Sequence, residues 1–142
     1  MGRDFLPVLL ATNATLPAMS LRNIVAALAG ATAYVWTLYR FLPYSERNEL
    51  PVSTYQTFAL AQLTLGFLVT LGAGKPRYRP AALAIFAALA AHMVVIAVDL
   101  QSDATDHNLF PLELLIIAFA ASPAFLGAAL AHFTDTARQR LL

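Results

Sequence analysis

The chain has 142 residues, of which 59% are hydrophobic and 12% are charged, and its formal net charge is +1. Soluble domains carry about twice that share of charged residues, because a small domain must cover a large surface with polar groups. The apolar content excludes a disordered chain, and the charge excludes an electrostatic nucleic-acid binder. The absence of cysteine excludes disulfides, thiolate zinc sites and iron–sulfur clusters. The composition predicts an integral membrane protein.

Residues 1–20 precede the first long apolar segment and contain a short apolar stretch that is interrupted by Pro7. This stretch is too short to cross a membrane. A signal peptide is an alternative, but Asp4 directly follows Arg3 and cancels the positive charge with which signal peptides begin. We expect an interfacial segment that leads into the first span.

Four apolar segments follow one another, at about residues 24–42, 55–71, 80–100 and 111–133. A helix of about 20 residues crosses a hydrocarbon core about 30 Å thick, and four such runs in so short a chain favour membrane spans over buried helices of a soluble protein. Pro80 and Pro111 fall in the first turn of their segments, where a missing N–H costs nothing. The sequence predicts an all-α fold with a single domain, a four-helix transmembrane bundle.

Basic and acidic residues are sorted between the two sides of the predicted membrane. With four spans, the N-terminus, the second loop and the C-terminus share one side, whose basic residues are Arg3, Arg22, Lys75, Arg77, Arg79, Arg138 and Arg140. The opposite side is mainly acidic, with Glu46, Glu49, Asp99, Asp103, Asp106 and Glu113 against Arg40 and Arg47. Cytoplasmic loops carry an excess of Lys and Arg. We therefore expect both termini in the cytoplasm and, as the default membrane, a bacterial inner membrane.

The predicted spans are rich in alanine and glycine, including Gly30, Gly66 and Gly127. Because lipid provides no hydrophobic drive for helices to associate, small residues that let two backbones approach are the expected contacts between spans. Pro123 lies inside the fourth segment and predicts a kink there.

Ionisable residues in the third segment are the first candidates for a functional site, because such groups are costly in lipid. At about 100° per residue, Asp99 lies about 20° from the line of His92, and Asp103 and Asp106 return to within about 40° of it. If the helix continues to Asp106, these four side chains form a polar stripe that leads from the outer surface down to His92.

Counting residues inward from the outer end of each span gives the neighbours of this stripe. Two levels result, a deep one with His92, Tyr34 and Gln62, and a shallow one with Asp99, Glu113 and Arg40. We expect an ion pair of Arg40 with Asp99 or Glu113, and an acidic polar pocket that opens outward with His92 as its floor. These six residues are the candidate ligand-binding residues.

Each candidate also has a purely structural interpretation. Asp99 and Glu113 can lie at the headgroup level, and Glu113 is in the first turn of its span, where the helix dipole favours an anion. His92 can be a buried histidine that hydrogen-bonds Tyr34 or Gln62. His107 fits turn and cap chemistry.

The usual cofactors find little support in the sequence. A bis-histidine haem requires two histidines at one depth, and His92, His107 and His132 are expected at three different depths. Asp103, Asp106 and His107 have the ligand types of a divalent metal site, but their spacing matches no tight metal motif. Nucleotide-binding fingerprints are absent from the sequence.

Three classes of function remain. The first, which we favour, is a binding or accessory subunit of a membrane complex or homo-oligomer, because the chain is small and its spans are rich in small residues. The second is a carrier or binder of a lipid-like or cationic small molecule in the outward pocket. The third is a membrane-embedded enzyme that uses Asp99 or Glu113 as general acid or base beside His92.

Overall fold

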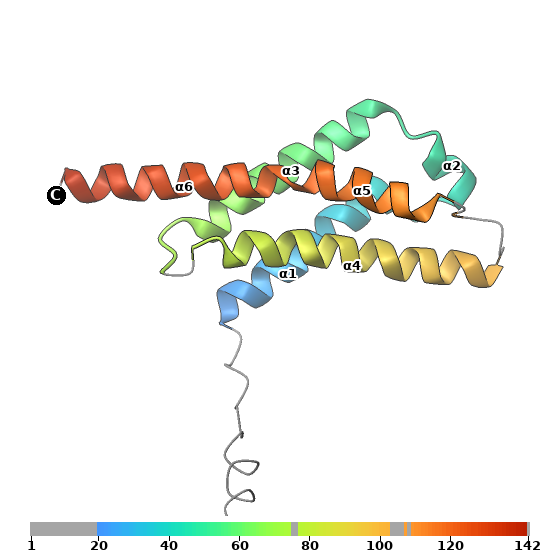
Figure 1. Ribbon diagram of the computed structural model, residues 1–142, viewed down its shortest axis with the longest axis horizontal. Helices are drawn as coiled ribbons and strands as arrows, with labels where there is room; N and C mark the ends of the chain where they lie inside the picture. The colour runs from blue at the N-terminus through green and yellow to red at the C-terminus, as the bar shows by residue number, and fades with distance from the viewer. Residues whose placement is uncertain (1–19, 75–76, 103–106, 108, 142) are drawn as a thin grey trace, which may run out of the picture.

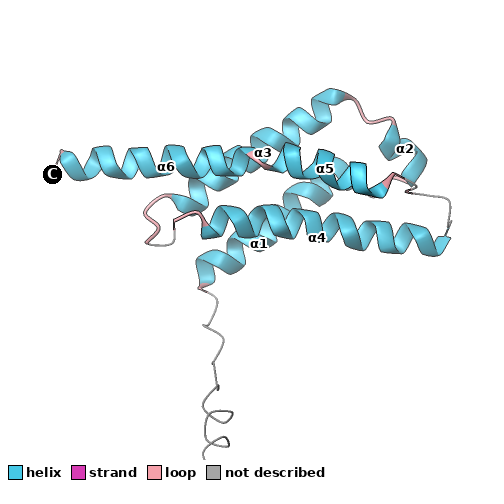
Figure 2. Cartoon of the chain, in the orientation of Figure 1, coloured by secondary structure: helices cyan, strands magenta, loops and turns pink. Residues whose placement is uncertain are grey.

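The computed structural model describes residues 20–74, 77–102, 107 and 109–141, and every regular element among them is helical, as Figure 2 shows. The all-α prediction is confirmed. The elements in chain order are α1 (Leu21–Tyr34), the π-helical segment η1 (Val35–Tyr39), α2 (Tyr44–Asn48), α3 (Val52–Thr70), α4 (Arg79–Ser102), α5 (Phe110–Ala121) and α6 (Pro123–Arg140). The predicted interfacial segment, apart from Ser20, lies outside the described residues, as do Asp103 and Asp106.

The helices pack as two close pairs, α1 with α4 and α3 with α6. In Figure 1, α4 and the α5–α6 stretch run along the long axis of the molecule, and α1 and α3 are inclined to them. A Cβ atom added to Gly30 of α1 would lie 2.1 Å from the carbonyl oxygen of Ala84 in α4, and one added to Gly66 of α3 would lie 2.0 Å from that of Ala124 in α6. The backbones therefore touch at the glycines, as the small-residue pattern predicts.

The connection from α1 to α2 is an abrupt turn. The π-helical segment ends at Tyr39, and Arg40 and Phe41 follow with φ of 50° and 57°. This left-handed region is uncommon for residues other than glycine. The turn leads into the short helix α2, from which α3 runs back along the bundle (Figure 1).

Two helical stretches are long and apolar enough to cross a membrane, Arg79–Ser102 and Phe110–Arg140. The second is interrupted at Ser122, immediately before Pro123, where the sequence predicts a kink. The Ser122 hydroxyl donates to the carbonyl oxygen of Phe119 at 2.7 Å. Large apolar side chains point away from the bundle, and Phe119 itself is 82% exposed.

Candidate functional site

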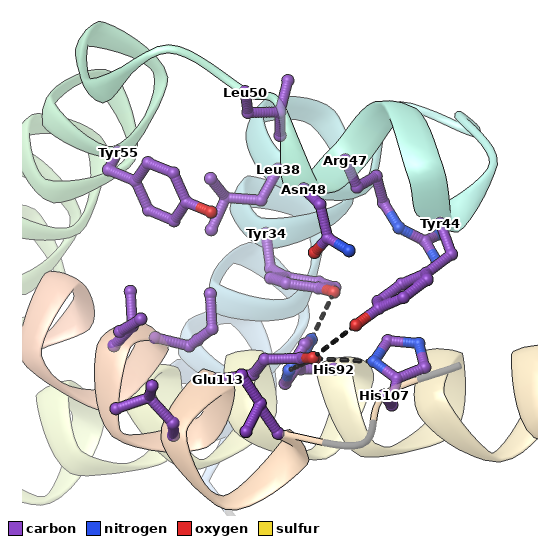
Figure 3. Close-up of a pocket in the computed structure, with 14 residues that line it drawn as sticks. Tyr34, Leu38, Tyr44, Arg47, Asn48, Leu50, Tyr55, His92, His107 and Glu113 are labelled. Atoms are coloured by element: carbon purple, nitrogen blue, oxygen red, sulfur yellow. Dashed lines mark hydrogen bonds and ion pairs between the residues drawn. The ribbon is translucent and has the colours of Figure 1, made fainter. Parts of the chain in front are cut away.

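A cavity of about 320 Å³ lies at the α2 end of the bundle, where α1, η1, α2, α3, α4 and α5 meet (Figure 3). This volume is at the lower end of the range of about 300–1,000 Å³ that is typical of small-molecule sites. The lining residues are Tyr34, Leu38, Tyr44, Arg47, Asn48, Leu50, Tyr55, His92, His107, Leu109, Leu112, Glu113, Ile116 and Ile117.

Arg47 of α2 is the cation at the mouth of the cavity. Its guanidinium forms an ion pair with Asp99 of α4 and donates a hydrogen bond to the carbonyl oxygen of Leu42 at 3.0 Å. It also lies over the ring of Tyr39, 5.0 Å from the ring centre. The Arg47 side chain is only 9% exposed, so this ion pair is largely removed from solvent.

His107 joins the two carboxylates of the site. Its Nε2 is 2.8 Å from Asp99 Oδ2, and its Nδ1 is 2.6 Å from Glu113 Oε2. Only the doubly protonated imidazolium has a hydrogen to donate at both nitrogens. The ring packs against Tyr44, with ring centres 4.1 Å apart, and the backbone of His107 is left-handed, with φ of 58°.

His92 and Glu113 face each other on the floor of the cavity (Figure 3). The hydroxyl oxygen of Tyr34 is 2.7 Å from His92 Nδ1, and the Tyr44 hydroxyl donates to Glu113 Oε1 at 3.0 Å. His92 Nε2 is buried and has no hydrogen-bond partner among the residues that the structure describes. Its nearest charged neighbour, Glu113 Oε2, is 3.6 Å away.

Of the six candidate ligand-binding residues, the structure places four in this cluster. Tyr34, His92 and Glu113 line the cavity, and Asp99 holds Arg47 and His107 from the α4 side. The hydrogen bond between Tyr34 and His92 joins two residues that depth counting places at the same level.

Arg40 and Gln62 are placed elsewhere, and the predicted Arg40 ion pairs are a wrong prediction. Arg40 is exposed and lines a separate recess with Thr37 and Ser53, because the left-handed turn directs it away from the bundle, and Arg47 pairs with Asp99 instead. Gln62 is fully buried but does not line the cavity. Phe58, one turn before Gln62 on the same face of α3, is also fully buried and likewise does not line the cavity.

Sequence reasoning missed the contributions of Tyr44 and Arg47 and underrated His107. The region between Pro43 and Pro51 reads as a loop, and the only signal for α2 is a short polar stretch after a proline. Sequence reasoning also gave no sign that His92 and His107 are neighbours, with ring centres 6.3 Å apart.

No group of three or more metal-ligating side chains is found within the described part of the chain, and of the suggested metal ligands only His107 is among the residues described. His132, the remaining histidine, contacts Arg77 at the opposite end of the helices. No known protein family, characterised protein or solved structure matches the chain.

The cavity is lined by both apolar and polar side chains. Most of the apolar ones come from α5 and the segment before it, namely Leu109, Leu112, Ile116 and Ile117. The polar ones include tyrosines, His92 and Glu113. An amphipathic molecule can bury its apolar part against α5 and place one polar group beside His92 and Glu113, which is the usual composition of a small-molecule site.

Proposed function

We propose that the chain is a four-span membrane protein with both termini in the cytoplasm and the cavity at the outer side. α3 has 19 residues, and α1 with η1 has the same total length, which corresponds to about 28 Å of helix. These two segments therefore approach the thickness of a hydrocarbon core beside the two stretches already described. Arginines gather at the end away from the cavity, Arg22, Arg77, Arg79, Arg138 and Arg140, and this sorting supports a cytoplasmic position for that end.

The function that the site supports best is binding of a small amphipathic molecule, as a binding subunit or carrier in the membrane. The observation that carries this proposal is the buried Nε2 atom of His92, which lacks a partner and faces Glu113 inside a cavity. A buried polar atom without a hydrogen bond costs about 1–3 kcal/mol. A ligand that supplies the missing bond recovers this cost and stabilises the folded protein.

Native mass spectrometry tests the proposal on protein extracted in mild detergent from its own membranes. We expect a mass increment from a bound small molecule in the wild type and in Arg40→Gln, whose side chain lies outside the cavity. The increment should be lost in His92→Phe, which keeps a ring of similar size but removes both ring nitrogens. Wild-type protein that carries no small molecule, whether alone or with stoichiometric foreign subunits, would overturn the proposal; the second result would favour a purely accessory role.

A further inference from the structure

The charged side chains around the cavity neutralise one another. Arg47 pairs with Asp99, and His107 bridges Asp99 and Glu113. At 2.8 and 2.6 Å, each contact of His107 needs one hydrogen between its two atoms. With these two hydrogens and the Arg47 guanidinium, the charges of the four described residues sum to zero, whichever atom of each contact carries the hydrogen. Their side chains are between 2% and 19% exposed, so little solvent is present to screen an added charge.

This balance is unfavourable for a charged ligand. Asp99 accepts from Arg47 and His107, and Glu113 accepts from His107 and Tyr44. An ammonium group entering the cavity would find both carboxylates already paired, and a carboxylate or phosphate would find Arg47 and His107 already paired. In either case a net charge would be buried without a partner, and this costs several kcal/mol.

The open hydrogen-bonding position selects among neutral groups. The hydrogen bond between Tyr34 and His92 Nδ1 can form with either ring nitrogen protonated, so Nε2 either donates or accepts. A hydroxyl group does both, whereas a ketone or an ether only accepts. When Nε2 donates to the hydroxyl oxygen, the hydroxyl hydrogen is left to bond the Glu113 carboxylate, whose Oε2 is 3.6 Å from Nε2.

We infer that the ligand of this cavity is a neutral amphipathic alcohol, with its hydroxyl between His92 and Glu113 and its apolar body against α5. This inference rests on the binding function proposed above and names the chemical class of its ligand. The cavity volume of about 320 Å³ limits the part of the molecule that is enclosed to a small one.

Three photoreactive probes test the inference on the full chain in lipid nanodiscs. Each is the same medium-length alkyl diazirine, and they differ only in the end group: hydroxyl, ammonium or carboxylate. After illumination, labelled peptides are mapped by mass spectrometry. We expect the hydroxyl probe to label cavity-lining peptides of α5 about tenfold more than either charged probe, because burial of a net charge opposes both.

The outcomes separate this inference from the function on which it rests. If the ammonium or the carboxylate probe labels the cavity as well as the hydroxyl probe or better, the alcohol assignment is wrong and the binding function stands. If no probe labels cavity peptides above the level of lipid-facing peptides, the binding function fails together with the assignment.

A charge variant gives a second, independent test. Arg47→Gln leaves one negative charge in excess, and we expect the preference between the probes to shift toward the ammonium probe by about tenfold. The double variant Arg47→Gln with Asp99→Asn removes one charge of each sign and should restore the preference for the hydroxyl probe. An unchanged preference in Arg47→Gln would contradict the charge argument, and the wild-type comparison decides the assignment even if this variant does not fold.

Discussion

His107 is the residue on which the charged cluster depends. Its side chain is 2% exposed, both ring nitrogens contact carboxylates, and its backbone adopts the left-handed conformation that turns the ring under α2. A lone histidine in a polar loop gives no sign of this in the sequence, because the contacts come from residues eight positions before it and six positions after it. The left-handed backbone at His107 places its ring between the two carboxyl groups, and the residue type alone does not predict this position.

Replacing His107 should therefore be costly. In His107→Ala the carboxyl groups of Asp99 and Glu113 lose the imidazole that joins them while remaining largely buried, and we expect a loss of about 3–5 kcal/mol in the free energy of unfolding. Denaturant unfolding in detergent micelles measures it. His132→Ala, at the opposite end, is the matched control and should reduce the free energy of unfolding far less. An equal reduction in both variants would show that the contacts of His107 with Asp99 and Glu113 do not stabilise the fold.

Tyr34 positions His92 without closing the cavity. Tyr34→Phe removes the hydroxyl that bonds His92 Nδ1, so we expect a loss of about 1–2 kcal/mol in stability and weaker cavity labelling by the hydroxyl probe. Tyr78→Phe, at an exposed tyrosine, controls for the loss of a hydroxyl. Labelling that stays at the wild-type level while stability falls would assign Tyr34 a structural role only.

At the scale of elements, the backbone contacts at glycines define where the helices can cross. Gly66 touches Ala124, and Gly127, one turn further along α6, touches Leu63 in return. Each helix of this pair thus contributes a glycine to the same crossing. These two backbone contacts set the distance between α3 and α6, and a larger side chain in place of either glycine would increase it.

Gly66→Ala tests this crossing. The new Cβ would lie 2.0 Å from the carbonyl oxygen of Ala124, so α3 and α6 must separate, and we expect a cost of about 1–3 kcal/mol in thermal or denaturant unfolding. Gly74→Ala is the control, since a Cβ there meets nothing within 4 Å. A similar stability for both variants would contradict a close α3–α6 crossing.

The helices could be predicted because a long apolar segment of about 20 residues strongly favours a helix. The small residues within these segments indicate where two helices can pack closely. The contact between Tyr34 and His92 was also predictable, since both residues lie within helices whose geometry is fixed by residue count, although Gln62, placed at the same level, does not line the cavity. At the shallow level Asp99 and Glu113 join the site, but their cation could not be predicted. Arg40 and Phe41 leave the helical conformation, so counting along an ideal helix fails beyond Tyr39, and the five-residue helix α2 has no periodicity to detect.

At the scale of the whole molecule, the two ends differ in charge. Acidic side chains gather near the cavity, at α2, the end of α4 and the start of α5, whereas arginines gather at the start of α1, the start of α4 and the end of α6. The proposed orientation follows from this asymmetry and can be tested without reference to any ligand.

Because the sequence contains no cysteine, single cysteines can report the orientation without background. Glu49→Cys and Gln139→Cys place a thiol at exposed positions near opposite ends. We expect a membrane-impermeant maleimide to label Glu49→Cys in intact cells, and Gln139→Cys only after the membrane is permeabilised. The reverse pattern would invert the topology, and labelling of both positions in intact cells would contradict four spans.

The pairing of α1 with α4 and of α3 with α6 also has a consequence for biosynthesis. Neither pair joins helices that are consecutive in the chain, so when α1 leaves the ribosome its main partner has not yet been made. α3 in turn must wait for α6, and meanwhile Gln62 is exposed to whatever surrounds the nascent chain. The bundle can therefore close only when translation is nearly complete, and premature termination before α6 would leave α3 without its main partner.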